Sequence, residues 1–297
     1  MAEMTGVSPA TLRAWERRYG IPSPQRTASA YRLYTDRDVE LIKGLCELCD
    51  RGIAPAQAAQ MVKVTDRSHV EAVQLASDAA ELAVQKILAG IEHFDPDMIE
   101  AAVRHASLLG SGMTLFERVF APVMAEVGDR WRAGSMNIGQ EHLATQVIAA
   151  ATLDLIRLLR PSNPSRTVLL ACVVGEAHVL PVLAVALAMS EWNIRAVILG
   201  ADTPPEAIRC AVAEVRPDLV GLSATTAMPA DDAGPLLGAY AEACGRTPWI
   251  VGGRGTGDLR DLIEARGATV APGDRVQLRT TLDRLTSVRP GDATRAG

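Results

Sequence analysis

The chain has 297 residues and a net charge of −5, a length that suggests two or three domains. Apolar residues make up 48% of it, which is enough for real cores. No apolar run approaches the roughly 18 residues of a transmembrane helix, and no signal peptide is visible. We therefore expect a soluble, cytoplasmic protein with reduced thiols and no membrane partner.

Residues 1–65 are predicted to form a winged helix-turn-helix domain. Gly6 closes a first short helix. A second helix begins at Ser8 and Pro9, because serine caps free N–H groups at a helix start and proline fits the first turn. The alternating segment 31–34 then predicts the return strand of a wing. Two further helices are predicted at residues 36–51 and 54–62.

The second helix and the wing carry a cluster of positive charge. Between Thr11 and Arg32, five arginines stand against one acid, Glu16. This pattern is typical of a surface that faces phosphate, and a solvated arginine face is the alternative. Guanidinium groups bind both base edges and phosphates, whereas the two tyrosines either contact phosphate or pack the wing against the helix. The candidate DNA-contacting residues are Arg13, Arg17, Arg18, Tyr19, Arg26, Tyr31 and Arg32.

This domain resembles the MerR-type winged helix-turn-helix. The resemblance lies in residues 5–20, with the sequence TGVSPATLRAWERRYG, and in residues 31–34, with the sequence YRLY. The variant LRAWERRYG is similar to that of the cobalamin-linked CarA/CarH/LitR repressors. The family usually has a short strand before its first helix, whereas this sequence begins inside that helix. The resemblance implies binding to double-stranded operator DNA.

Residues 69–160 show helical periodicity without strand-like alternation. The polar segment 63–68 is predicted to be a linker. Short breaks rich in glycine and serine separate the helices, and short connections of this kind are typical of an up-and-down four-helix bundle. Its helices are predicted at residues 70–93, 96–108, 113–133 and 138–160.

Trp131, Glu141 and His142 flank the last connection of this bundle. On spacing alone they indicate a tryptophan that closes one end of a bundle. Together with the MerR match, they resemble the helical cap of CarH-type photoreceptors, which implies that Trp131 covers the adenosyl group of adenosylcobalamin and that Glu141 hydrogen-bonds it. In light sensors of this family a histidine follows the tryptophan and binds cobalt after photolysis. Arg132 stands there instead and cannot coordinate cobalt. His142 is nearby in sequence and is a candidate to take its place.

Residues 166–287 alternate strands and helices. Five βα units, beginning with a strand at 167–174, predict a doubly wound parallel sheet in the order 2-1-3-4-5. Such sheets bind ligands at the carboxyl ends of their strands, where the order reverses. The crevice is expected between the strands that end at Val174 and Ser223. Residues 288–297 have little apolar content and are predicted to be a flexible tail.

His178 follows the first of these strands, at the sheet edge where ligands bind. A lone loop histidine is most often a surface residue, but here its ring can bind a metal, and Glu176 can orient that ring. The segment Glu176-x-His178-x-x-Pro181 is similar to Asp-x-His-x-x-Gly of the cobalamin-binding domain in methionine synthase and the base-off mutases. The resemblance implies that His178 is the lower axial ligand of cobalt. Pro181 in place of glycine removes an N–H group and is expected to narrow the channel for the cofactor's tail.

Two later motifs complete this resemblance. Where the family has Ser-x-Leu and Gly-Gly, this chain has Ser223-Ala224-Thr225 and Gly252-Gly253. The resemblance implies that the displaced dimethylbenzimidazole tail runs beside Ser223 and Thr225. Gly252 and Gly253 would let the backbone approach it closely.

The predicted fold class is multidomain: an α winged helix-turn-helix, a four-helix bundle and an α/β Rossmann-like doubly wound parallel sheet. The resemblances imply a transcriptional repressor, not an enzyme, regulated by adenosylcobalamin. In the dark the cofactor would assemble a dimer or tetramer on the operator, and light would break the Co–C bond and dissociate it. Arg132 and Pro181 leave one alternative open, a cobalamin-independent repressor switched by an antirepressor protein. A corrinoid methyl-carrier is another, although it leaves the winged helix without a role.

Overall fold

The computed structural model describes residues 1–27, 29, 31–228 and 230–287, so the predicted tail at 288–297 lies outside it. The chain divides into two compact units, Met1–Ala79 and Ala80–Gly297. Among the described residues, none of the helices combines the length and apolar character needed to cross a membrane.

The first unit begins with α1 (Ala2–Thr5) and α2 (Pro9–Tyr19). Gly6 ends α1 in the left-handed conformation, with φ of 70°, which glycine adopts without steric cost. The Ser8 hydroxyl caps α2 by accepting a hydrogen bond from the Thr11 N–H at 3.1 Å. Both helix boundaries follow the prediction.

The predicted wing is a two-stranded antiparallel ribbon of β1 (Gln25–Arg26) and β2 (Arg32–Leu33). It leads into α3 (Asp36–Asp50), whose start is fixed by a capping box between Thr35 and Asp38. Behind these elements lies a small apolar core. Its buried side chains are Leu12, Ile21, Ile42, Leu45, Ala58, Ala59 and Val62.

Helix α4 (Pro55–Glu92) corrects the predicted linker. It is one continuous helix of 38 residues, so segment 63–68 is helical and the two helices predicted on either side are one. The segment is polar but contains neither glycine nor proline, and polarity alone does not break a helix with an exposed face. An ion pair between Arg37 of α3 and Asp66, with an N–O distance of 2.6 Å, also holds this segment.

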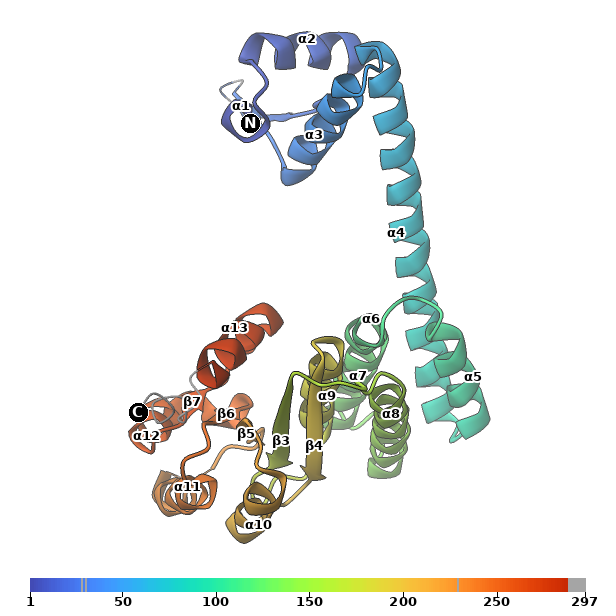
Figure 1. Ribbon diagram of the computed structural model, residues 1–297. Helices are drawn as coiled ribbons and strands as arrows, with labels where there is room; N and C mark the ends of the chain where they lie inside the picture. The colour runs from blue at the N-terminus through green and yellow to red at the C-terminus, as the bar shows by residue number, and fades with distance from the viewer. Residues whose placement is uncertain (28, 30, 229, 288–297) are drawn as a thin grey trace, which may run out of the picture. The chain divides into compact units, whose positions relative to one another are not determined.

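The second unit contains the predicted four-helix bundle, formed by the later part of α4 and three further helical segments (Figure 1). The second of these three segments is interrupted by one π-helical turn, η1, which apolar periodicity does not reveal. Ile87, Ile91, Phe120, Val123 and Ile148 are fully buried in its core. The segments are α5 (Pro96–Ala106), α6 (Gly112–Leu115), η1 (Phe116–Phe120), α7 (Ala121–Arg132) and α8 (Ile138–Leu158).

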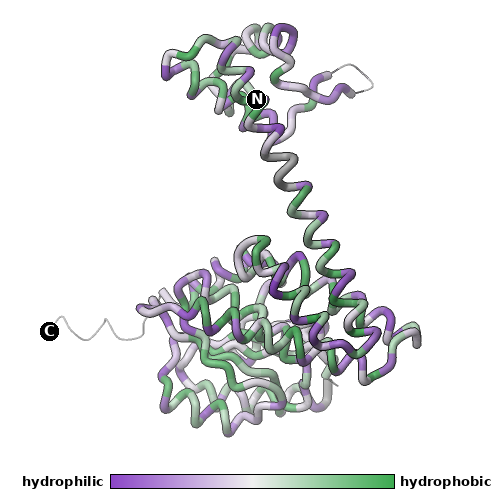
Figure 2. The backbone as a smooth tube through the Cα atoms, turned by 90° about the vertical axis from the view of Figure 1, so that its right-hand side faces the viewer, coloured by the Kyte–Doolittle hydropathy of each residue, from purple (hydrophilic) through white to green (hydrophobic). Residues whose placement is uncertain are grey.

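A five-stranded parallel sheet follows, in the order β4-β3-β5-β6-β7, which confirms the predicted 2-1-3-4-5 order. Figure 2 shows its strands as a largely hydrophobic stretch of backbone. Parallel strands buried on both faces have this character. The strands are β3 (Arg166–Cys172), β4 (Ile194–Gly200), β5 (Leu219–Ser223), β6 (Trp249–Gly252) and β7 (Thr269–Val270).

Helices cover both faces of the sheet, as the doubly wound fold requires (Figure 1). One apolar cluster joins the sheet to α10, α11 and α12, and a second joins it to α9 and α13. The bundle packs on α9, where Met113 shares a cluster with Leu187 and Ala188. These segments are α9 (Leu180–Glu191), α10 (Pro205–Val215), α11 (Ala230–Cys244), η2 (Arg254–Leu259), α12 (Arg260–Ala265) and α13 (Arg275–Thr286).

Candidate functional site

Glu176 joins two loops at the carboxyl edge of the sheet. Its side chain is only 2% exposed, and a buried carboxylate requires partners. One oxygen, Oε1, accepts hydrogen bonds from the backbone N–H and the ring Nδ1 of His178, at 2.8 and 2.5 Å. The other, Oε2, accepts from the backbone N–H groups of Thr225 and Thr226, at 2.5 and 2.7 Å. Glu176 therefore ties the loop after β3 to the loop after β5, at the predicted crevice.

These contacts decide the charge of Glu176. Burial raises its pKa, but the hydrogen bonds from the His178 and Thr226 N–H groups, the His178 ring and the Thr225 N–H outweigh burial and lower the pKa to about 2. An ionised carboxylate only accepts hydrogen bonds, so Nδ1 of His178 carries the proton. In the neutral ring this leaves the Nε2 lone pair free, on a side chain that is 65% exposed. The pair thus presents a metal-ligating nitrogen.

The low pKa of Glu176 predicts a specific pH dependence of stability. A carboxyl group whose pKa falls from 4.5 to about 2 on folding stabilises the protein above pH 4.5, and this contribution is lost as the pH falls through that range. We expect the group to account for a loss of about 2 kcal/mol in unfolding free energy between about pH 5 and about pH 3. Urea unfolding of the wild type and of Glu176→Gln across this range measures it. Equal losses in the two proteins would contradict the assignment.

A second set of contacts fixes the loop that carries His178. The buried Tyr240 hydroxyl donates to the Thr203 carbonyl at 2.6 Å and accepts from the Val174 N–H at 2.9 Å. Burial raises the pKa of Tyr240 to about 12, so the hydroxyl keeps its proton. The Asp202 carboxylate accepts from the Gly175 N–H at 2.8 Å. Neither Tyr240 nor Asp202 was predicted from the sequence. The one available signal concerned Asp202, a polar residue just beyond the carboxyl end of β4.

A cavity of about 210 Å³ lies beside this loop, between α9, the central strands and the loop after β7. Its lining brings together Pro181, Ser223, Gly252 and Gly253, four residues that the sequence motifs singled out. Most of the remaining lining is apolar, with few polar groups, as is typical of ligand sites. The Thr225 side chain is not part of this lining, although its hydroxyl is buried and has no hydrogen-bond partner among the described residues.

Pro181 disturbs the site less than its sequence position suggested. It occupies the first turn of α9, where backbone N–H groups have no partner within the helix. Proline at this position therefore costs the helix no hydrogen bond. The side chain does line the cavity, so its effect on a ligand is one of shape.

The predicted cap residues lie at one end of the bundle. Trp131, in the last turn of α7, is 48% exposed. Glu141, in the first turn of α8, accepts a hydrogen bond from the Thr145 hydroxyl at 2.8 Å and lies 3.7 Å from Nε2 of His142. Arg132 is exposed and pairs with Asp129. Within the described residues, no hydrogen bond or ion pair joins Trp131 or Glu141 directly to the loop of His178, so their part in one site stays a prediction.

The predicted DNA-contacting residues divide into two groups. Arg13, Arg17 and Arg18 of α2 are exposed, and Tyr31 of the wing is 74% exposed. Tyr19 is partly buried against the apolar core of its unit. Arg26 and Arg32 instead bind Glu16 of α2, at 3.3 and 2.7 Å, and thereby hold the wing against the helix. The exposed arginines are Arg13, Arg17, Arg18 and Arg26.

Three family models match the chain in order: a MerR HTH family regulatory protein at residues 1–64, and a B12 binding domain at 83–152 and again at 166–276. Fold and site thus define a helix-turn-helix regulator with B12 binding domains. The HTH-type transcriptional repressor CarH of Myxococcus xanthus is 33% identical over 92% of this chain and 93% of its own length. CarA of the same organism is 30% identical over 91% of each. The chain belongs to the family of these repressors.

A solved structure agrees with the fold of the second unit. The monomethylamine corrinoid protein of Methanosarcina barkeri aligns with a TM-score of 0.52 and 18% identity, covering 70% of this chain and 96% of that one. At this identity the likeness concerns the fold alone.

Proposed function

We propose that this protein is a repressor that binds double-stranded operator DNA under the control of adenosylcobalamin, with His178 as the lower ligand of cobalt. The observation that carries the proposal is the pair of Glu176 and His178. A buried, ionised carboxylate holds Nδ1–H of the ring, and the exposed ring keeps Nε2 for a metal. A carboxylate behind a ligating histidine is the usual support of a metal site.

The residues around this pair suit the cofactor. The cavity lined by Ser223, Gly252 and Gly253 would take its nucleotide tail, and the unpartnered Thr225 hydroxyl offers a buried polar group near the same loops. Trp131, Glu141 and His142 would cover the opposite face of the cofactor. When bound, adenosylcobalamin supplies a light-sensitive cobalt–carbon bond, and that sensitivity would make the repressor respond to light.

Oligomer formation would connect the cofactor to DNA binding. A single small winged helix contacts few phosphates, so its binding alone should be weak and salt-sensitive. A ligand that favours a dimer or tetramer raises the apparent affinity for an operator with several sites, because further contacts become intramolecular. Arg13, Arg17, Arg18 and Tyr31 would contact DNA directly, and Arg26 and Arg32 would position the wing as well as contact phosphate.

Size-exclusion chromatography with absorbance detection tests this proposal. The protein is incubated with adenosylcobalamin in the dark and run before and after green light, and the same samples are assayed for retardation of operator DNA. We expect cobalamin to co-elute, the dark species to be larger, and light to reduce both size and retardation.

Three other outcomes would contradict the proposal in whole or in part. If light changes the spectrum but neither the size nor the retardation of DNA, photolysis is not coupled to assembly and light control is excluded. Arg132, at the position of the family's histidine, is then the expected cause. If no cobalamin co-elutes and DNA is still retarded, the cobalamin-independent repressor, switched by an antirepressor protein, is the better account. Methyl transfer from a substrate would indicate a corrinoid carrier.

A further inference from the structure

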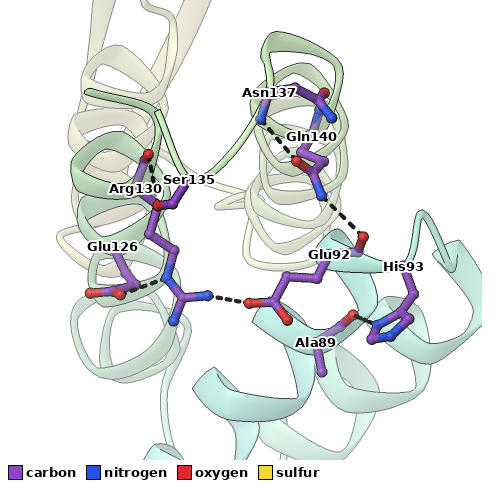
Figure 3. Close-up of polar contacts among 8 residues, drawn as sticks. All are labelled: Ala89, Glu92, His93, Glu126, Arg130, Ser135, Asn137 and Gln140. Atoms are coloured by element: carbon purple, nitrogen blue, oxygen red, sulfur yellow. Dashed lines mark hydrogen bonds and ion pairs between the residues drawn. The ribbon is translucent and has the colours of Figure 1, made fainter. Parts of the chain in front are cut away.

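The end of helix α4 contacts the residues that precede two of the predicted cap residues, Trp131 and Glu141. Glu92, the last residue of α4, forms an ion pair with Arg130 of α7. Arg130 uses a second nitrogen, Nε, to bind Glu126 at 2.7 Å. Figure 3 shows its guanidinium between the two carboxylates, one on α4 and one on its own helix. Only the bond to Glu92 connects different helices.

A second contact holds the same residue of α4. The Gln140 side-chain amide donates to the backbone carbonyl of Glu92 at 3.0 Å, and its oxygen accepts from the Asn137 N–H at 2.9 Å (Figure 3). Asn137 and Gln140 also form the capping box of α8, so this side chain is fixed at both ends. Glu92 is therefore bound through its carboxylate by α7 and through its carbonyl by α8.

The surrounding turn is also ordered. The His93 ring nitrogen Nδ1 lies 2.8 Å from the Ala89 carbonyl, one of the last carbonyls of α4. The Ser135 hydroxyl donates to the Arg130 carbonyl at 3.1 Å, which closes the turn after α7 (Figure 3). Unsatisfied carbonyl groups at helix ends need such partners, so the ends of α4 and α7 are both held in defined positions.

The two residues that bind Glu92 immediately precede the two predicted cap residues. Arg130 is followed by Trp131, and Gln140 is followed by Glu141. In a helix, neighbouring side chains point about 100° apart, so one can bind α4 while the next remains available to a ligand. Movement of Glu92 would shift the two turns that carry Trp131 and Glu141 together.

We propose that Glu92 is a positioning residue for the cobalamin cap. Its side chain acts through Arg130 on Trp131, whereas its backbone carbonyl, which any residue at this position supplies, holds the Gln140 side chain next to Glu141. A substitution of the side chain therefore tests the Arg130 contact alone. The proposal rests on the cap role of Trp131 and Glu141 given above. Helix α4 also contributes Ala58, near its start, to the core of the DNA-binding unit. The residue that positions the cap thus ends the helix that leads from that unit.

Glu92→Gln and Glu126→Gln form a matched pair for the test. Each removes one carboxylate partner of Arg130, but only the first removes a bond between helices. In the cofactor-free protein, we expect Glu92→Gln to raise acrylamide quenching of Trp131 about twofold, since loss of a bridging contact frees the turn. The Trp131 signal is obtained by subtracting the emission of Trp131→Phe. Glu126→Gln should quench like the wild type.

Cobalamin affinity gives the second readout. We expect Glu92→Gln to raise the dissociation constant of cobalamin about fivefold. In the Trp131→Phe background we expect no such increase, because the effects of residues that act through one another are not additive. Equal effects of Glu92→Gln in both backgrounds, or equal behaviour of Glu92→Gln and Glu126→Gln, would overturn the proposal.

Two controls keep the test decisive. If the wild type binds no cobalamin, the proposed function fails, while quenching in the cofactor-free proteins still decides on Glu92. If circular dichroism shows that Glu92→Gln does not fold, Arg130→Lys replaces it, because lysine keeps the charge but cannot bridge two carboxylates with one planar group. Unchanged quenching in that variant would overturn the proposal.

Discussion

His178→Ala is expected to weaken cobalamin binding by at least about 100-fold, because loss of a partner behind a metal ligand already costs about 10- to 100-fold. The Nε2 atom of His178 is the proposed metal-ligating group of the Glu176–His178 pair, and alanine offers no replacement. Titration of cobalamin, followed by its absorbance, measures both the affinity and the change of axial ligand. Added imidazole should restore the spectrum of a nitrogen ligand.

Two further variants make the result specific. Glu176→Gln should weaken binding about tenfold, since the ring of His178 remains but loses its charged partner. His105→Ala removes an exposed histidine of α5 and should bind cobalamin like the wild type. Wild-type affinity in His178→Ala would exclude His178 as the lower ligand, whatever the other variants do.

The fold was largely predictable because its signals are local. Strand and helix periods alternate through residues 166–287, and right-handed crossovers leave few orders for such a sheet. Pro9 and Ser8 mark a helix start by chemistry that acts within one turn. The predicted break at 63–68 was wrong, because the segment contains neither glycine nor proline and polarity alone does not end a helix. The contact of Asp66 with Arg37, 29 positions away in sequence, leaves no local trace.

The site was predictable only as far as its motifs reach. Glu176, His178, Ser223 and the glycine pair stand in a recognisable order. In the structure Ser223 and the glycine pair line one cavity, and Glu176 and His178 lie in the loop after β3 at the same edge of the sheet. The partners that hold them come from distant positions that no motif connects. Tyr240 reaches the loop of His178 across 66 positions, and this pairing follows only from the packing of α11 on the sheet.

Gly253→Ala is expected to destabilise the second unit by more than about 4 kcal/mol, among the largest effects of a single substitution. Gly253 has a φ of 111°, a conformation that costs other residues about 1 to 3 kcal/mol. A Cβ there would also lie 2.3 Å from the Ala224 carbonyl oxygen. That oxygen accepts the Gly255 N–H at 2.9 Å, and the Ala224 N–H donates to Gly252 at 2.8 Å. The clash would therefore separate the loop after β5 from the loop after β6, whose residues Ser223 and Gly253 line the same cavity.

Gly273→Ala is the matched control for this prediction. Gly273 lines the same cavity, but its φ is not positive and a Cβ there would meet no atom within 4 Å. Its unfolding free energy in urea should stay within about 0.5 kcal/mol of the wild type, as for most unstrained surface changes. If Gly253→Ala were as stable as Gly273→Ala, the close backbone approach would not exist in solution. The glycine pair would then have no structural reason to stand at this cavity, and its place in the motif would need another cause.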